Sequence, residues 1–185
     1  VTGYTLAPQC AVVTALDVVW RDQSRILVVA GIKADSWERM ERDLPASAQL
    51  RQESLDFDVI GYGCTSAATV SGQEGVARAI NSVCPRAKVT DPLTALIAAA
   101  NALGARKLGF VTPYIPDVSM RMRHKLEEAG FEIPAFGSFE ETDDRVVARI
   151  TPASIATAID RVAAQADCDA IVVSCTNLRC LEVIS

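Results

Sequence analysis

Short apolar runs alternate along the chain with longer segments of helical pattern. Strands are predicted at residues 3–6, 25–30, 57–62, 87–90, 107–112 and 169–174. Helices are predicted between them, at residues 36–44, 72–83, 92–103, 117–130 and 152–166. The run at 25–30 is unbroken, as in a strand that is buried on both faces of a parallel sheet. Strands and helices alternating at this spacing predict right-handed βαβ units, and therefore an α/β fold with parallel sheets flanked by helices.

Capping and breaking residues mark several of these boundaries. Asp91 precedes Pro92, the arrangement of an N-cap followed by proline at the first helical position, and Gly104 follows the last turn of that helix. Pro45 is predicted to end the helix before it. Residues 131–133 are expected to lead into a polar loop.

One segment of the chain occurs twice. Residues 58–66 and residues 169–177 each begin with an Asp, continue as an apolar run, and close on Cys-Thr and a small polar residue. We therefore expect two pseudo-symmetric lobes, at residues 1–90 and 91–185, with an active site in the cleft between them. The second lobe is expected to lack its last elements, because a full repeat needs a further helix, strand and closing helix after the second copy.

Composition limits the classes of partner. Apolar residues make up 50% of the chain and aromatic residues 5%, which is typical of a globular α/β protein. The formal net charge of −5 argues against nucleic acid or an anionic membrane surface as a partner. The longest apolar stretch, at residues 93–103, is too short to span a bilayer, and the chain does not open on a secretory signal. We therefore expect a soluble, cytoplasmic protein without a nucleic-acid or membrane partner.

The chain has six cysteines and one histidine. Without a secretory signal, reduced thiols are expected rather than disulfides. Cys84 and Cys168 are interpreted as small buried apolar residues. Cys175 and Cys180 lack a second Cys/His pair and His124 lies in a charged helix, so no metal site, cysteine hydrolase or Ser-His-Asp triad is predicted. No dinucleotide fingerprint, phosphate-binding loop or Schiff-base lysine is found either, so the expected chemistry uses no cofactor.

Cys64 and Cys175 stand at the carboxyl ends of predicted strands, which is where open parallel sheets bind ligands. A helix that begins after each Cys-Thr turn places backbone N–H groups and a positive helix end near a sulfur, and both favour a thiolate. The same N–H groups and the neighbouring hydroxyls can hold a carboxylate. We therefore predict two catalytic thiols and, as substrate-binding residues, Thr65, Ser66, Thr176 and Asn177. The alternative interpretation is that each cysteine is only a small buried residue at a strand end.

Three segments together resemble the aspartate/glutamate racemase superfamily: Gly-Cys-Thr-Ser-Ala at 63–67, Val-Thr-Pro-Tyr at 111–114 and Ser-Cys-Thr-Asn-Leu-Arg at 174–179. Within it, the chain is most similar to the branch that contains maleate cis–trans isomerase, arylmalonate decarboxylase and the ectoine-utilisation protein A group. The resemblance covers nearly the whole chain. The first motif, together with short segments between residues 137 and 150, favours the ectoine-utilisation group.

The resemblance implies a cofactor-independent reaction of a small carboxylic acid. In such isomerases the first cysteine, here Cys64, attacks the alkene carbon of maleate, forms a covalent succinyl adduct, and releases fumarate after rotation about the new single bond. Cys175 is then the partner acid or base, and Tyr114 hydrogen-bonds a substrate carboxylate or the developing enolate. Racemases of the superfamily use two thiols as opposed bases, whereas the decarboxylase keeps only the second. Because both thiols are present, isomerisation or racemisation is expected. A homo-oligomer, either a dimer or a tetramer, is expected as well.

Two positions depart from the maleate isomerase pattern. Residues 7–10 stand where an Asn that binds a carboxylate is expected, and Asp143 or Asp144 replaces a second Asn. An acid there repels a dicarboxylate unless it is protonated or paired, which leaves room for an amino-acid-derived substrate with a positive group. Arg179 is either a carboxylate clamp or a surface residue. Two alternatives stay open: an arylmalonate-type decarboxylase that uses Cys175, and a non-catalytic ligand-binding or redox-sensing protein on the same fold.

Overall fold

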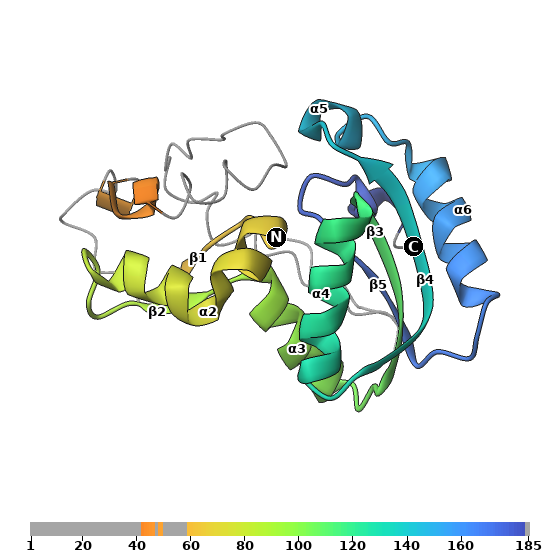
Figure 1. Cartoon of the computed structure of the whole chain (residues 1–185), viewed down its shortest axis with the longest axis horizontal. Coiled ribbons are helices and arrows are strands. Elements are labelled where there is room, and N and C mark those ends of the chain that lie inside the picture. Colours follow the sequence, from red (N-terminus) through yellow and green to blue (C-terminus); the bar gives the residue numbers. More distant parts are fainter. Residues whose placement is uncertain (1–41, 47, 50–58, 184–185) are drawn as a thin grey trace, which may run out of the picture.

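The computed structural model describes residues 42–46, 48–49 and 59–183. Within these ranges the strands form two parallel sheets, as the alternating pattern predicts (Figure 1). The strands expected at 3–6 and 25–30 lie outside the described residues. One sheet pairs β1 (Val59–Gly61) with β2 (Lys88–Thr90), and the other has the order β4–β3–β5, with β3 at Lys107–Tyr114, β4 at Glu132–Glu141 and β5 at Ala170–Val173.

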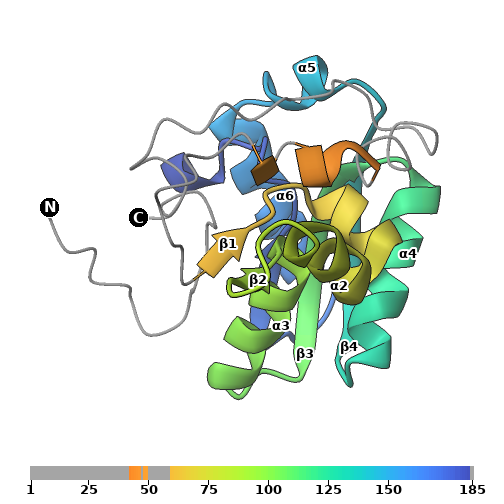
Figure 2. The same cartoon turned by 90° about the vertical axis from the view of Figure 1, so that its left-hand side faces the viewer.

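The connections between strands are helical. They are α2 (Thr65–Asn81), α3 (Pro92–Ala102), α4 (Pro116–Glu128), α5 (Asp144–Val147) and α6 (Pro152–Ala163), and the 3-10 helix η2 (Cys180–Val183) follows β5. Helices α4 and α6 cover opposite faces of the three-stranded sheet (Figure 1). Helix α5 lies at the end of the sheet where β4 finishes, as the turned view also shows (Figure 2). Among the described residues, no helix has the length and apolar character that crossing a membrane requires.

Strand β3 lies at the centre of the three-stranded sheet and divides the core, because its side chains point alternately to the two faces. Phe110 is fully buried in the cluster that includes Met122 of α4. The next residue, Val111, is fully buried in a separate cluster with Val162 of α6. Every residue of β3 after Lys107 is buried, as in a strand covered on both faces of a parallel sheet.

The acid that begins the second copy of the repeat ties β5 to β3. The Asp169 carboxylate accepts hydrogen bonds from the backbone N–H groups of Arg106 (2.7 Å) and Lys107 (2.8 Å). These two donors lower the pKa of Asp169 because they stabilise its charged form. Asp169 therefore sets where the two parallel strands begin to pair. Asp58, the equivalent acid of the first copy, lies outside the described residues.

The predicted start and end of the helix after β2 are confirmed. The Asp91 carboxylate accepts from the backbone N–H groups of Leu93 (2.9 Å) and Thr94 (3.0 Å), and Pro92 occupies the first turn. Gly104 follows the helix with φ of 70°, in the left-handed region that favours glycine.

The expected polar loop after residues 131–133 is wrong, because residues 132–141 form β4. This strand pairs only with β3 in the described sheet, and it therefore lies at an edge. The first residues of β4 alternate between exposed and buried and most of the later ones are only partly buried, so the strand tolerates the polar residues that suggested a loop. Strand β3 also runs past Pro113 to Tyr114, where a register irregularity accommodates the missing N–H group.

Two helix boundaries also differ from expectation. Helix α2 begins at Thr65, well before the predicted start at Gly72, and Gly72 instead interrupts it with φ of 69°. Residues 42–46 are helical, so Pro45 does not end that helix. The β1–β2 sheet precedes residue 91 and the three-stranded sheet follows it, but the division into domains at that point stays a prediction.

Candidate active site

Cys64, which carries the first predicted thiol, follows strand β1 and occupies the N-cap position of helix α2, where its side chain makes no capping hydrogen bond. Cys64 has extended backbone angles at the N-cap position, and its sulfur lies 3.6 Å from the Ser66 hydroxyl. Thr65 and Ser66 form the first turn of α2 and are both buried. Cys64 is half-buried and packs against the main core cluster. The expectation of a helix after the first Cys-Thr turn is therefore confirmed.

The second predicted thiol follows β5 in a different local structure. Cys175 has φ of 114°, a left-handed conformation that is strained for any residue other than glycine. The backbone N–H of Asn177 points at its sulfur, with 3.4 Å between N and Sγ. The N–H of Leu178 donates to the Cys175 carbonyl (3.2 Å), which closes a turn. The expected helix directly after this turn is therefore wrong; only the short helix η2 follows, from Cys180.

The two turns contact each other directly. The Thr176 hydroxyl donates a hydrogen bond to the carbonyl of Gly63, with 2.8 Å between the oxygens. Gly63 and Thr176 each neighbour one of the two cysteines, so this bond joins the two copies of the repeat at the position of their thiols.

Tyr114 lies between the two turns, at the carboxyl end of β3. Its phenol forms a hydrogen bond with the Cys175 thiol and another with the Thr65 hydroxyl, and Cys64 is close enough to act on it electrostatically. Burial raises the pKa of Tyr114 well above its ordinary value, and Cys175 raises it further, so the phenol keeps its proton. The resemblance assigned Tyr114 to the substrate; in this structure its described partners are the two turns.

Three hydroxyl groups hold the backbone of Tyr114 in place. Its N–H donates to the Thr112 hydroxyl (3.2 Å), while its carbonyl accepts from Ser119 (3.0 Å) and from Ser138. Thr112 and Ser119 are fully buried. The sequence analysis missed these residues. Thr112 and Ser138 are partners in register, but that signal was out of reach because β4 was expected to be a loop.

Burial dominates the electrostatics of Cys175. It raises the pKa of this thiol, and the Asp144 carboxylate and Cys64 raise it further. The Tyr114 hydroxyl and the Asn177 N–H act in the opposite direction because they hydrogen-bond the thiolate. The net effect is a raised pKa, so the expectation that this turn favours the thiolate is wrong: no helix follows it directly, and the thiol holds its proton at neutral pH.

Asp143, the N-cap of α5, and Asp144, its first residue, have different surroundings. Asp143 caps α5 through the N–H of Arg145 (2.8 Å) and pairs with its guanidinium (2.7 Å). These interactions lower the pKa of Asp143 to about 2. Asp144 instead meets the second turn, because its carbonyl accepts a hydrogen bond from the Asn177 side-chain amide (2.7 Å). The structure thus brings Asp144, and not Asp143, to the thiols.

The remaining candidates lie apart from the two turns or in the core. Arg179 pairs with Glu182 (2.7 Å), which supports the interpretation as a surface residue. His124 is exposed on α4, as expected from its charged neighbours. Cys84 is buried, as predicted, whereas Cys168 is only half-buried.

Cys180 is a further buried thiol near the second turn. Burial raises its pKa to about 11, and Cys175 contributes to the same rise. Cys180 is therefore a thiol and not a thiolate near neutral pH. In the part of the chain that the structure describes, no three His, Cys, Asp or Glu side chains are grouped as a metal ion requires.

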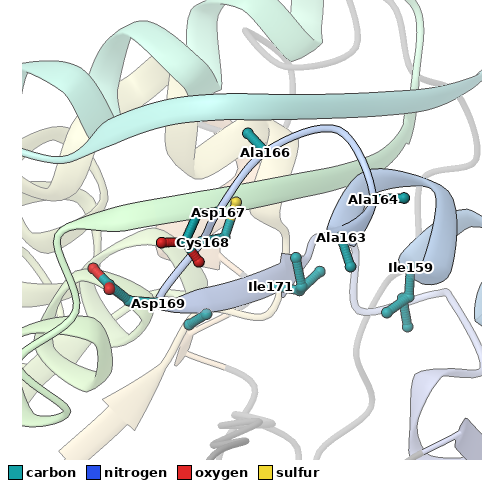
Figure 3. A pocket seen from close by; sticks show the side chains of 9 residues that line it. Ile159, Ala163, Ala164, Ala166, Asp167, Cys168, Asp169 and Ile171 are labelled. Carbon is teal, nitrogen blue, oxygen red and sulfur yellow. The ribbon is translucent and has the colours of Figure 1, made fainter.

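A pocket of about 710 Å³ lies at the other end of β5 (Figure 3). It is formed around Cys168 and Ile171 by the end of α6 and the start of β5, and it includes none of the predicted site residues. Because β5 separates this pocket from Cys175, which follows the strand's carboxyl end, the pocket is distinct from the site of the two turns.

Solved structures with the same fold include enzymes of two activities. The maleate isomerase Iso from Pseudomonas putida is 24% identical, with a TM-score of 0.75, and the match covers 84% of this chain and 65% of that chain. A double mutant of arylmalonate decarboxylase in the liganded form is 22% identical, with a TM-score of 0.73, over 83% of this chain and 66% of that chain. A mutant of the Nocardia farcinica maleate cis-trans isomerase, with a covalently bound succinylcysteine intermediate, is 22% identical, with a TM-score of 0.70, over 81% of this chain and 64% of that chain.

The chain spans just under two thirds of the length of these solved proteins. No curated protein matches the chain. The arylmalonate decarboxylase family matches it over residues 84–185, which is more than half of its 185 residues. The matched region includes the second Cys-Thr turn and Tyr114 together with the whole three-stranded sheet. The chain therefore belongs to the arylmalonate decarboxylase family.

Proposed function

We propose that the protein is a cofactor-independent isomerase or racemase of a small carboxylic acid that works through Cys64 and Cys175. The observation that carries this proposal is the position of Tyr114, whose phenol contacts Cys175 and Thr65 and lies close to Cys64. Two thiols on separate turns, with one phenol between them, suit a reaction in which a carbon is attacked or deprotonated by one thiol and protonated by the other.

The surroundings of Cys175 support its role as the proton donor at the start of the reaction. Its pKa is raised mainly by burial, so it carries a proton that it can give to a carbanion or enolate. Once the proton has gone, the Tyr114 hydroxyl and the Asn177 N–H stabilise the thiolate by hydrogen bonds.

Cys64 is the nucleophile or base in this proposal. In the isomerase reaction its thiolate forms a C–S bond to one alkene carbon, and the electron pair of the double bond moves to the adjacent carboxylate as an enolate. Cys175 gives its proton to the enolate carbon, which completes the succinyl adduct. After rotation about the single bond, the Cys175 thiolate takes a proton back from that carbon, the C–S bond breaks, and the alkene returns in the other geometry with both cysteines in their starting states. In the racemase reaction the Cys64 thiolate takes the α-proton, and Cys175 delivers its own proton to the opposite face. A succinylcysteine is bound in one structurally similar isomerase, which supports the covalent route.

The first turn of α2 is the proposed carboxylate site. Thr65 and Ser66 present hydroxyls and backbone N–H groups next to Cys64. Thr176 and Asn177 were predicted to share this task, but the Thr176 hydroxyl donates its proton to Gly63 and the Asn177 amide bonds Asp144. We therefore assign the Thr176 side chain to holding the two turns together and the Asn177 side chain to joining the second turn to α5.

The test is proton NMR in D2O with the full-length protein and a panel of small acids. The panel contains maleate, aspartate, glutamate and phenylmalonate, and the resemblance to the ectoine-utilisation group adds N-acetyl-diaminobutyrate. Cys64→Ala and Cys175→Ala are compared with Cys168→Ala, a control whose thiol lies in the separate pocket. Isomerised or α-deuterated product that both site variants lose, and that the control keeps, supports the proposal. Unchanged turnover in either site variant contradicts it.

A second candidate function is arylmalonate-type decarboxylation through Cys175 alone. It is favoured by the family match, which covers Cys175 but begins after Cys64. In this reaction the substrate loses carbon dioxide and Cys175 protonates the resulting enediolate. Carbon dioxide release from phenylmalonate that survives Cys64→Ala and is lost in Cys175→Ala supports this candidate over the first.

A further inference from the structure

Asn177 uses its backbone and its side chain for separate hydrogen bonds. Its backbone N–H points at the Cys175 sulfur, with 3.4 Å between N and Sγ. Its side-chain amide donates to the backbone carbonyl of Asp144, with 2.7 Å between nitrogen and oxygen. Asp144 is the first residue of α5, so this single residue joins the Cys175 sulfur to that helix.

Helix α5 is short, but the core fixes its position. Val147 is fully buried in the main core cluster, against which Cys175 also packs. Within the helix, the Asp144 carbonyl accepts from the N–H of Ala148 (3.0 Å). A carbonyl oxygen has two lone pairs, so the second is available to the Asn177 amide. The side chain of Asn177 therefore bonds a carbonyl that its own helix and the core hold in place.

The backbone of Cys175 needs support from outside the turn. Its φ of 114° is disfavoured for a residue with a Cβ atom, and such a conformation persists only where the surroundings hold it. On one side, the N–H of Ser174 donates to the carbonyl of Val111 in β3 (2.9 Å). On the other side, the Thr176 and Asn177 side chains bond separate parts of the chain. Asn177 differs from Thr176 because its own N–H also faces the sulfur.

A hydrogen bond weakens steeply when the donor turns away from the acceptor. Without its side-chain bond, Asn177 keeps its N–H but loses the contact that fixes the direction of that N–H. We propose that Asn177 is a positioning residue: its side chain, fixed on α5, keeps its own backbone N–H directed at the Cys175 sulfur and so stabilises the thiolate that remains when Cys175 gives up its proton. The inference rests on the proposed function for the role of that thiolate.

The electrostatics of Cys175 agree with this assignment. The Asn177 N–H lowers the pKa of the thiol, against the larger effect of burial. The titratable groups that interact with this thiol come from the surrounding elements, namely Tyr114 of β3, Cys64 before α2, Asp144 of α5 and Cys180 of η2. Asn177→Ala changes none of these groups and removes no charge. A change in the titration of Cys175 in this variant therefore reports the direction of the N–H.

The test measures the ionisation of Cys175 and does not depend on turnover. Alkylation of the full-length protein by iodoacetamide is followed over a range of pH, by mass spectrometry of the peptide that contains Cys175. The readout is the pH of the half-maximal rate, which reports ionisation and not access to the sulfur. This pH should be higher in Asn177→Ala, and the fraction of thiolate below it should fall about threefold, the size of a partly exposed hydrogen bond to a charged group.

Gln165→Ala is the matched control. The Gln165 side-chain amide also donates to a backbone carbonyl, that of Phe136 in β4 (3.1 Å), and its removal should leave the Cys175 profile unchanged. Asn177 is exposed, so its truncation leaves the core intact. The positioning role is overturned if Asn177→Ala titrates like the wild type or at lower pH, or if the control shifts by the same amount.

The outcomes separate this inference from the proposed function, whose criterion is the loss of NMR-detected turnover in both cysteine variants. A shifted Cys175 profile in a protein that turns over no acid of the panel supports the position of Asn177 and contradicts the proposed function. Where an acid is turned over, Asn177→Ala should lower kcat by a similar factor and leave KM unchanged, because the thiolate forms only after the substrate has bound. An unchanged kcat would overturn the role of Asn177 in the reaction.

Discussion

The Thr176 hydroxyl donates a hydrogen bond to the carbonyl of Gly63, across 113 positions of sequence. The two residues belong to the two copies of the repeated segment, and each neighbours one of the predicted thiols. The bond therefore sets how close the turns come, while Tyr114 contacts both from the carboxyl end of β3. The geometry of the candidate site depends on this pair as much as on the cysteines themselves.

Thr176→Val should separate the two turns while it preserves the shape of the side chain. Losing the donor leaves the Gly63 carbonyl without this bond, and we expect the free energy of unfolding to fall by about 0.5–1.5 kcal/mol. Urea denaturation measures this change. Thr176→Ser keeps the hydroxyl and should stay close to wild type. Equal stability of the Val and Ser variants would show that the hydrogen bond does not hold the turns together.

Tyr114→Phe should make Cys175 harder to ionise. The Tyr114 hydroxyl lowers the pKa of Cys175 by hydrogen-bonding its thiolate, so its removal raises that pKa further. The pH profile of alkylation at Cys175, followed by mass spectrometry, should move to higher pH. Asp144→Asn should move the same profile to lower pH, because the Asp144 carboxylate raises the pKa of this thiol. Shifts of the two profiles in the same direction would contradict this account.

Cys175 lies at a strained backbone position, and the strain can be measured with a pair of variants. Both Cys175→Gly and Cys175→Ala remove the sulfur, but only glycine adopts φ of 114° without a steric penalty. We expect the Gly variant to be more stable than the Ala variant by about 1 kcal/mol, after the greater freedom of glycine in the unfolded chain is allowed for. Thermal denaturation provides the comparison. A more stable Ala variant would show that the turn carries no such strain.

Gly109 allows helix α6 to approach strand β3. A Cβ atom there would lie 2.9 Å from Val162 Cγ1 and closer still to Ile171 Cδ1. Gly109→Ala should therefore lower the free energy of unfolding by about 1–3 kcal/mol through overpacking. Gly63→Ala is the control, since a Cβ at Gly63 meets nothing within 4 Å. Denaturant titration should place the Gly63 variant near wild type; a similar loss in both variants would point to the backbone and not to packing.

The sequence alone predicted those helix ends and strands that depend on interactions between residues close together in the chain. Asp91, Pro92 and Gly104 mark the ends of their helix because capping groups bond within one turn. A strand was predicted at residues 107–112 and β3 occupies Lys107–Tyr114, because a short apolar run between turn residues specifies a strand locally. The repeated Cys-Thr segment likewise indicated two turns at the ends of strands, although a helix follows directly only after the first. In contrast, β4 was missed because the pairing that makes it a strand comes from a distant segment.

The sequence by itself determined the alternating α/β pattern, the parallel strands and the two cysteine turns, since these follow from the period of apolar residues and from residue types at turns. Only the tertiary structure decided how the turns meet. The bond from Thr176 to Gly63, the position of Tyr114 between the thiols, the raised pKa of Cys175 and the approach of Asp144 all depend on residues far apart in the chain. A thiol's pKa depends on the burial and the charges that packing places around it, and neighbours in sequence do not specify those.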